Sequence, residues 1–144
     1  MATVQSVLDR KGSQVVTIDV AETVLAAAKL MNERSIGGLV VLDGGQVAGM
    51  FTERDILRRV VAAQRDPART PVGDVMTTQV AFCRRDTLLD DCRAVMTERR
   101  IRHLPVMDDQ CVCGIVTIGD LTAHEVTDRE ATIQYLNEYI FGVR

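Results

Sequence analysis

The sequence contains no tryptophan, and only 3% of its 144 residues are aromatic. Proteins that hold single-stranded nucleic acid stack the bases on aromatic rings, so this scarcity argues against such a function. Basic residues are not in excess either, because 17 Lys and Arg stand against 20 Asp and Glu, for a net charge of −3. Proteins that bind a phosphate backbone usually carry a basic surplus. The composition therefore predicts that no nucleic acid is a partner.

Long apolar runs are also absent. No stretch approaches the roughly 18 consecutive apolar residues that a membrane-spanning helix needs. The N-terminal residues MATVQSVLDRKG lack the apolar core of a signal peptide. We therefore expect no membrane partner and a cytoplasmic location. The hydrophobic fraction of 47% is nevertheless sufficient for a packed core.

Residues for catalysis or metal binding are few. The chain has two histidines, and all four cysteines lie in its second half, at Cys83, Cys92, Cys111 and Cys113. Structural disulfides are rare in cytosolic proteins, and the spacing does not suit a zinc site. We expect free thiols that are buried or half-buried, with a weak cysteine-based redox function as an alternative. Without a nucleophile–base pair or a metal cluster, we expect no enzyme, no catalytic cofactor and no metal.

What the sequence does contain is a repeat. Residues 31–57 and 96–122 align without gaps at a constant offset of 65 positions, and 11 of the 27 aligned residues are identical. A unit of this length that occurs only twice is unlike a solenoid repeat. We interpret it as a tandem of two small half-domains that share one core.

Each copy predicts the order strand, helix, strand, strand, helix, and hence an α+β fold. The Pro-containing linker at 65–73 separates a first repeat at 1–64, which includes an N-terminal leading segment, from a second repeat at 74–126. The tail at 127–144 predicts a helix with an apolar stripe, which would cover either this chain or a dimer partner. The predicted strands and helices are 15–18, 22–34, 39–42, 47–51 and 53–63 in the first copy, and 79–82, 87–100, 104–107, 112–116 and a helix after Thr117 in the second.

The most informative motif is G-x-x-T-x-x-D, which occurs once in each copy where a strand meets a helix. A helix N-terminus can hold a phosphate, and a carboxylate one turn later can accept hydrogen bonds from the two hydroxyls of a ribose. The same pattern is also a plain helix cap, so a purely structural role stays open. The two copies of the motif are Gly49, Thr52 and Asp55, and Gly114, Thr117 and Asp120.

This order of elements, the doubled motif and the segment RHLPV at 102–106 resemble a pair of cystathionine β-synthase (CBS) domains, the Bateman module. The resemblance covers about residues 4–123, and the small size resembles stand-alone bacterial CBS-pair proteins. It implies two pseudo-symmetric β-α-β-β-α repeats packed through their sheets. It also implies a homodimer that binds an adenine nucleotide, with AMP favoured and ATP or NAD(H) as alternatives. Such a sensor would signal energy or redox state to an unidentified protein partner, whereas a dimeric structural adaptor without ligand is the competing interpretation.

The resemblance also assigns roles to individual residues. Asp55 and Asp120 would hold ribose, and Thr52 and Thr117 would approach phosphate. Two basic residues, Arg54 and Lys11, are further phosphate candidates, although either suits an ordinary surface position. The walls of the adenine pockets are expected from Thr17, Ile18, Gly37, Gly38, Phe82, Cys83, Arg102, His103, Leu104 and Pro105. Because Gly37 and Gly38 oppose Arg102 and His103 in the repeat, and Arg54 opposes Gly119, we expect two unequal sites.

Overall fold

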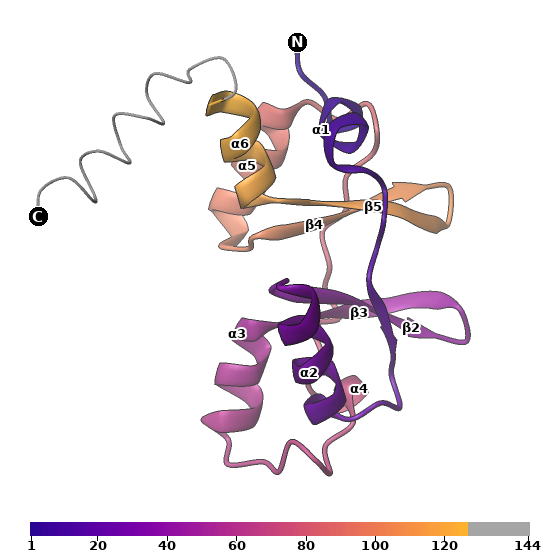
Figure 1. The fold of residues 1–144 in the computed structure, drawn as a ribbon, viewed down its shortest axis with the longest axis vertical. Coiled ribbons are helices and arrows are strands. Elements are labelled where there is room, and N and C mark those ends of the chain that lie inside the picture. Colours follow the sequence, from indigo (N-terminus) through magenta and orange to yellow (C-terminus); the bar gives the residue numbers. More distant parts are fainter. Residues whose placement is uncertain (127–144) are drawn as a thin grey trace, which may run out of the picture.

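The computed structural model describes residues 1–126, and the predicted tail helix lies outside the described residues. Figure 1 shows two halves, one above the other, each with its strands toward the other half and its helices outside. The predicted α+β class, with two repeats that meet through their sheets, is thus confirmed. In the described part of the chain, no helix is both long enough and apolar enough to cross a membrane.

The first half contains a three-stranded sheet. β1 (Thr17–Asp19) runs parallel to β2 (Gly38–Asp43), and β2 pairs with β3 (Gln46–Thr52) through an antiparallel hairpin. Gly44 and Gly45 form the predicted turn, with φ of 60° and 83°, in the region that favours glycine. The elements are β1 (Thr17–Asp19), α2 (Val24–Arg34), β2 (Gly38–Asp43), β3 (Gln46–Thr52), α3 (Glu53–Asp55) and η1 (Ile56–Val61).

The helix expected over 53–63 is not a regular α-helix. After the single turn of α3, the chain continues as the π-helix η1, in which the Ala62 amide donates to the Leu57 carbonyl at 2.9 Å. The apolar pattern of this segment fits both kinds of helix, so the sequence does not distinguish them. Isolated π-helical turns occur often at functional sites.

The second half contains a two-stranded antiparallel sheet, and the strand expected at 79–82 is absent. Only Cys83 pairs with this sheet, through a parallel bridge to Val106. The reason is Pro105. In the first half the equivalent residue, Val40, donates its amide to the Val16 carbonyl at 3.2 Å, and proline has no amide hydrogen to do so. The elements are α5 (Leu89–Arg99), β4 (His103–Asp108), β5 (Cys111–Thr117) and α6 (Ile118–Val126).

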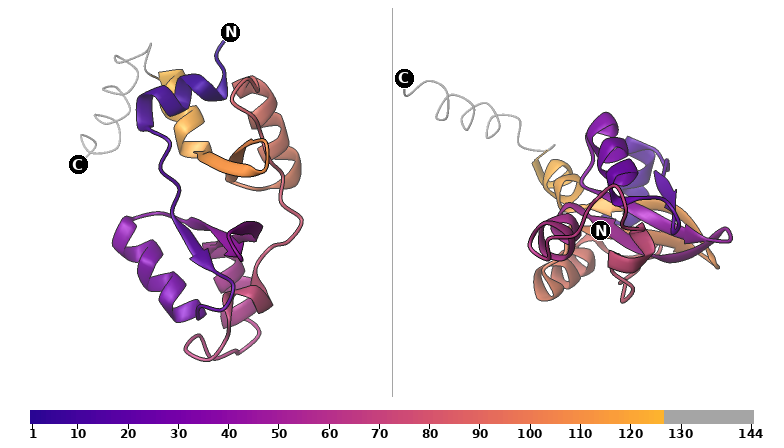
Figure 2. Two further views of the ribbon diagram at one scale, coloured as in Figure 1. Left: turned by 90° about the vertical axis from the view of Figure 1, so that its right-hand side faces the viewer. Right: turned by 90° about the horizontal axis from the view of Figure 1, so that it is seen from below.

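The segment that leads into each half packs against the other half. α1 (Val4–Lys11) lies beside α5 and α6 in Figures 1 and 2, and Val4, Val7 and Leu8 are buried in the second half's core. Conversely, α4 (Val72–Val75) is buried in the core of the first half. The structure therefore has two hydrophobic cores, not one shared core. The predicted division by chain order, which placed the leading segment in the first half, differs from this packing.

Candidate functional site

A cleft with a volume of about 590 Å³ lies where the two halves meet. Four stretches form most of it: the end of β3 with α3 and η1, the crossing segment at 77–81, the turn between α5 and β4, and the junction of β5 with α6. Both halves therefore contribute side chains to one cavity. Its lining consists of Gly37, Met50, Thr52, Glu53, Arg54, Asp55, Leu57, Arg58, Thr77, Gln79, Val80, Ala81, Arg100, Ile101, Arg102, His103, Thr117 and Ile118.

The Asp55 carboxylate is a buried acceptor at the edge of this cleft, with 5% of the residue exposed. Its Oδ2 accepts the Thr52 amide at 3.0 Å, and the Asp55 amide is 3.4 Å from the Thr52 hydroxyl, so the pair forms a capping box. Its Oδ1 accepts the Thr77 hydroxyl at 2.9 Å and lies 3.9 Å from Nε of Arg59. The carboxylate is thus held in place by groups from the first half and the crossing segment.

Asp120 repeats the capping box with a different partner. Its Oδ2 accepts the Thr117 amide at 2.9 Å, and its own amide donates to the Thr117 hydroxyl at 3.1 Å. Where Asp55 meets a neutral hydroxyl, Asp120 meets Lys11, whose Nζ lies 2.7 Å from Oδ2 and donates to the Ile115 carbonyl at 3.0 Å. Lys11, the last residue of α1, therefore forms an ion pair with Asp120, the aspartate of the second motif.

The glycine of each motif allows a segment from outside the β-hairpin to approach the backbone closely. A Cβ on Gly49 would lie 2.4 Å from the Thr77 carbonyl oxygen, and a Cβ on Gly114 would lie 2.7 Å from Cδ2 of Leu8. At Gly49 this close approach permits the bridge between Met50 and Thr77. Gly49 thus lets Thr77 approach β3, and the Thr77 hydroxyl in turn donates to the Asp55 carboxylate.

Four arginines line the cleft, two from each half. Arg54 donates from Nη1 to the Arg100 carbonyl and so joins the two halves. The side chains of Arg58, Arg100 and Arg102 make no hydrogen bond or ion pair within residues 1–126. The cleft therefore presents several guanidinium groups with unused donors.

Comparison with known proteins assigns the family. The family model of the CBS domain matches residues 6–62 and 72–126. The chain belongs to the CBS-domain family. The predicted resemblance is thus confirmed, and the chain is a CBS pair. CBS-domain proteins are in general regulatory modules without catalysis.

The CBS pair is similar to the CBS domain-containing protein YhcV of Bacillus subtilis (strain 168), with 36% identity over 126 residues, which are 88% of this chain and 89% of YhcV. A solved protein with CBS domains from Burkholderia ambifaria MC40-6 has 39% identity and a TM-score of 0.87, over 90% of this chain and 97% of that one. The CBS domain pair of protein MJ0100 was solved with 5′-methylthioadenosine and S-adenosyl-L-methionine. It has 24% identity and a TM-score of 0.79 over 90% of this chain and 99% of its own, and this likeness shows the fold alone.

His103 is the titratable ring in the cleft of this CBS pair. A Cβ on Gly38 would lie 3.3 Å from Cδ2 and Nε2 of the ring, so the ring covers the start of β2. Burial lowers the pKa of His103 below its ordinary value. The neighbouring Glu53 opposes this effect, whereas Arg102 and Lys11 add to it. We conclude that the ring is neutral at pH 7.

The predicted site residues fall into four groups. The cleft brings together Gly37, Thr52, Arg54, Asp55, Arg102, His103 and Thr117. Buried positions outside its lining hold Ile18, Gly38, Cys83, Leu104 and Pro105, while Thr17, Phe82 and Gly119 are exposed, and Lys11 and Asp120 pair with each other. The sequence reasoning missed several lining residues, namely Arg58, Thr77, Gln79, Val80, Ala81 and Arg100.

The cysteines lie apart from the cleft. Cys83 and Cys92 are buried and Cys113 is half-buried, as predicted, but Cys111 is exposed. A hydrogen bond with the Cys92 thiol, together with burial, raises the pKa of Cys83, so this thiol stays neutral. Within the described residues, no group of three or more metal-ligating side chains comes together.

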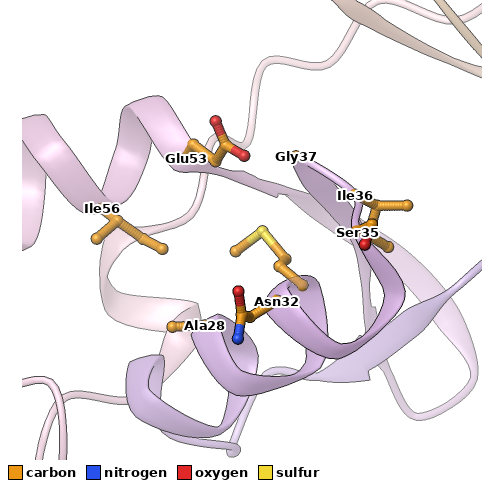
Figure 3. Close-up of a pocket in the computed structure, with 8 residues that line it drawn as sticks. Ala28, Asn32, Ser35, Ile36, Gly37, Glu53 and Ile56 are labelled. Carbon is orange, nitrogen blue, oxygen red and sulfur yellow. The ribbon is translucent and has the colours of Figure 1, made fainter.

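A smaller hollow of about 380 Å³ lies within the first half, between α2 and α3 with η1. Figure 3 shows Asn32 and Ala28 on α2, with Glu53 and Ile56 on the opposite side. Gly37 alone among the predicted site residues lines it. The cleft between the halves is therefore the better candidate site.

Proposed function

We propose that this CBS pair is a non-catalytic regulatory module that binds an adenine nucleotide in the cleft between its halves. The observation that carries the proposal is the composition of the cleft, which combines a fixed carboxylate, threonine hydroxyls and arginines from both halves. A ligand that contacts both halves stabilises one arrangement of them over others, and such a population shift is a physical basis for signalling.

The chemistry of the cleft suits the parts of a nucleotide. The Asp55 oxygens would accept hydrogen bonds from ribose hydroxyls, as acidic residues do in other nucleotide-binding folds. The guanidinium of Arg54 or Arg58 would pair with phosphate oxygens. Further support comes from protein MJ0100, whose CBS pair binds adenosine compounds on the same fold.

Thermal unfolding with and without nucleotide tests the proposal. A ligand at about 100 times its dissociation constant stabilises the folded state by roughly 2.7 kcal/mol. We expect a rise in Tm of several degrees with AMP, ATP or NADH, because about 1 kcal/mol moves a domain of this size by roughly 2–8 °C. An unchanged Tm with all three at millimolar concentration would contradict the proposal.

A double-mutant cycle tests the role of Asp55. Wild-type protein should bind 2′-deoxy-ATP more weakly than ATP by about 1.5–3 kcal/mol, the value of a hydrogen bond to a charged group. Asp55→Asn should bind the two nucleotides with similar affinity, whereas the matched variant Asp120→Asn should keep the wild-type difference. If Asp55→Asn also keeps the full difference, then Asp55 serves only as a helix cap.

One observation favours a second candidate function. Both Thr–Asp pairs form capping boxes, which a structural adaptor without ligand would also need.

We further propose a homodimer that acts on a cytoplasmic protein partner. The exposed apolar side chains Leu57 and Val61, with 63% and 62% of their surfaces accessible, support association. Light scattering at micromolar concentration tests the dimer, and a monomer would contradict it.

A further inference from the structure

We propose that the cleft selects a ligand with a chain of two or more linked phosphates, such as a nucleoside triphosphate, over a monophosphate. This inference rests on the proposed nucleotide site and departs from the expectation that AMP is favoured. Its basis is the number and origin of the guanidinium groups in the cleft. Arg54 and Arg58 come from α3 and η1, and Arg100 and Arg102 come from the turn between α5 and β4.

Little in the protein neutralises these groups. The contact of Arg54 is a neutral carbonyl, and the other three side chains have no partner within residues 1–126. Asp55 is engaged by Thr77 and faces Arg59, which lies outside the lining. The four guanidiniums of the lining face two carboxylates, those of Glu53 and Asp55, and Arg59 beside Asp55 adds a fifth guanidinium, so the positive charges exceed the negative ones by three.

A monophosphate cannot match this arrangement. One phosphate monoester carries only about −1.5 to −2 at pH 7, which leaves part of the positive charge uncompensated. Each guanidinium also pairs best with two oxygens, and a terminal phosphate has three. Four guanidiniums from two separate segments therefore fit a longer run of phosphate oxygens.

Comparison of the two copies of the repeat shows that none of these four arginines has an arginine at the equivalent position of the other copy. At the offset of 65, the positions that match Arg54, Arg58, Arg100 and Arg102 are Gly119, Ala123, Ser35 and Gly37. A role common to both halves, such as capping or packing, would be served in both copies. The threonine and aspartate are repeated, but the arginines are not. The arginines therefore have no counterpart in the structure that the two copies share, and this asymmetry favours a role toward the ligand of this cleft, although Arg54 also joins the halves through the Arg100 carbonyl.

Calorimetric titration of the full chain in magnesium-free buffer tests the inference, with ATP, AMP, adenosine and inorganic tripolyphosphate as ligands. We expect ATP to bind at least tenfold more tightly than AMP, and tripolyphosphate to bind and to compete with ATP. Arg58→Ala should weaken ATP and tripolyphosphate by about tenfold to hundredfold, because it removes charge-assisted contacts. The matched control Arg65→Ala removes an exposed arginine outside the cleft and should leave both affinities unchanged.

The outcomes separate this inference from the proposed function. If AMP binds as tightly as ATP and tripolyphosphate does not bind, the inference is wrong while nucleotide binding stands. If tripolyphosphate and ATP bind equally, Arg58→Ala weakens both, and adenosine and AMP do not bind, then the phosphate chain is the ligand and the adenine part of the proposed function fails. If neither ATP nor tripolyphosphate binds, the inference is overturned.

Discussion

Replacing Gly49 with alanine tests how the cleft is positioned. The new Cβ would lie 2.4 Å from the Thr77 carbonyl oxygen, a backbone atom that cannot rotate away. Two hydrogen bonds depend on this approach, from the Met50 amide to the Thr77 carbonyl at 2.9 Å and from the Thr77 amide to the Met50 carbonyl at 2.8 Å. The substitution must therefore separate β3 from the crossing segment.

The expected cost follows from two effects. Overpacking typically costs about 1–3 kcal/mol, and each weakened backbone hydrogen bond costs about 0.5–1.5 kcal/mol. We expect Gly49→Ala to lower the free energy of unfolding by about 2–4 kcal/mol, which corresponds to roughly 10 °C in Tm. Chemical denaturation followed by circular dichroism measures the first quantity, and calorimetry measures the second.

Two other glycines supply controls. A Cβ on Gly119 would meet only the Thr117 hydroxyl at 3.6 Å, so Gly119→Ala should not lower Tm. Gly114→Ala should be intermediate, because its nearest neighbour, Leu8 Cδ2 at 2.7 Å, belongs to a side chain that can move. If Gly49→Ala melts within about 2 °C of Gly119→Ala, the reasoning about the crossing segment is refuted.

Three further predictions concern the polar groups. Asp55→Ala should lower the free energy of unfolding, measured by urea denaturation, by about 1–3 kcal/mol, because it leaves buried donors without an acceptor. Asp120→Ala should lower it by less, and equal losses for the two variants would contradict this. Lys11→Ala should lower the free energy of unfolding by at most about 1 kcal/mol, since its ion pair is partly exposed. Because it frees the Asp120 carboxylate, it should also add a second, weaker ATP-binding step in calorimetry. An unchanged isotherm would argue against the idea that Lys11 keeps Asp120 from binding a ligand. Because the pKa of His103 is lowered in the folded state, the unfolded state binds this proton first, and stability should fall as pH drops below about 6.5. His103→Gln should flatten that fall in a series of Tm measurements, and an identical pH profile would contradict the assignment.

Local patterns in the sequence were sufficient for the halves and most of their elements. The helices over 24–34 and 89–99 and the hairpins in each copy follow from apolar spacing and turn residues, and the constant offset placed the two aspartates at equivalent positions. Pro105 could also have revealed the missing strand, because its lack of an amide hydrogen is visible in the sequence.

Long-range packing could not be predicted in the same way. α1 and α4 are both short segments with buried valines, and nothing local states which core each one joins. The contact of Lys11 with Asp120 spans 109 positions and depends on that exchange. Arg58 and Arg100 were missed because a charged residue in a helix or at its end usually faces solvent, although their absence from the other copy was a readable signal.

The most direct test of the central claim is the location of the ligand on the full chain in solution. Amide chemical shifts of uniformly labelled protein, followed during titration with ATP, report which residues are affected. We predict saturable changes concentrated in the three stretches at 52–58, 77–81 and 100–103, which contain most of the residues that line the cleft between the halves. Saturable changes confined to the hollow along α2, at residues 28–36, or no saturable changes at all, would contradict a nucleotide site in this cleft.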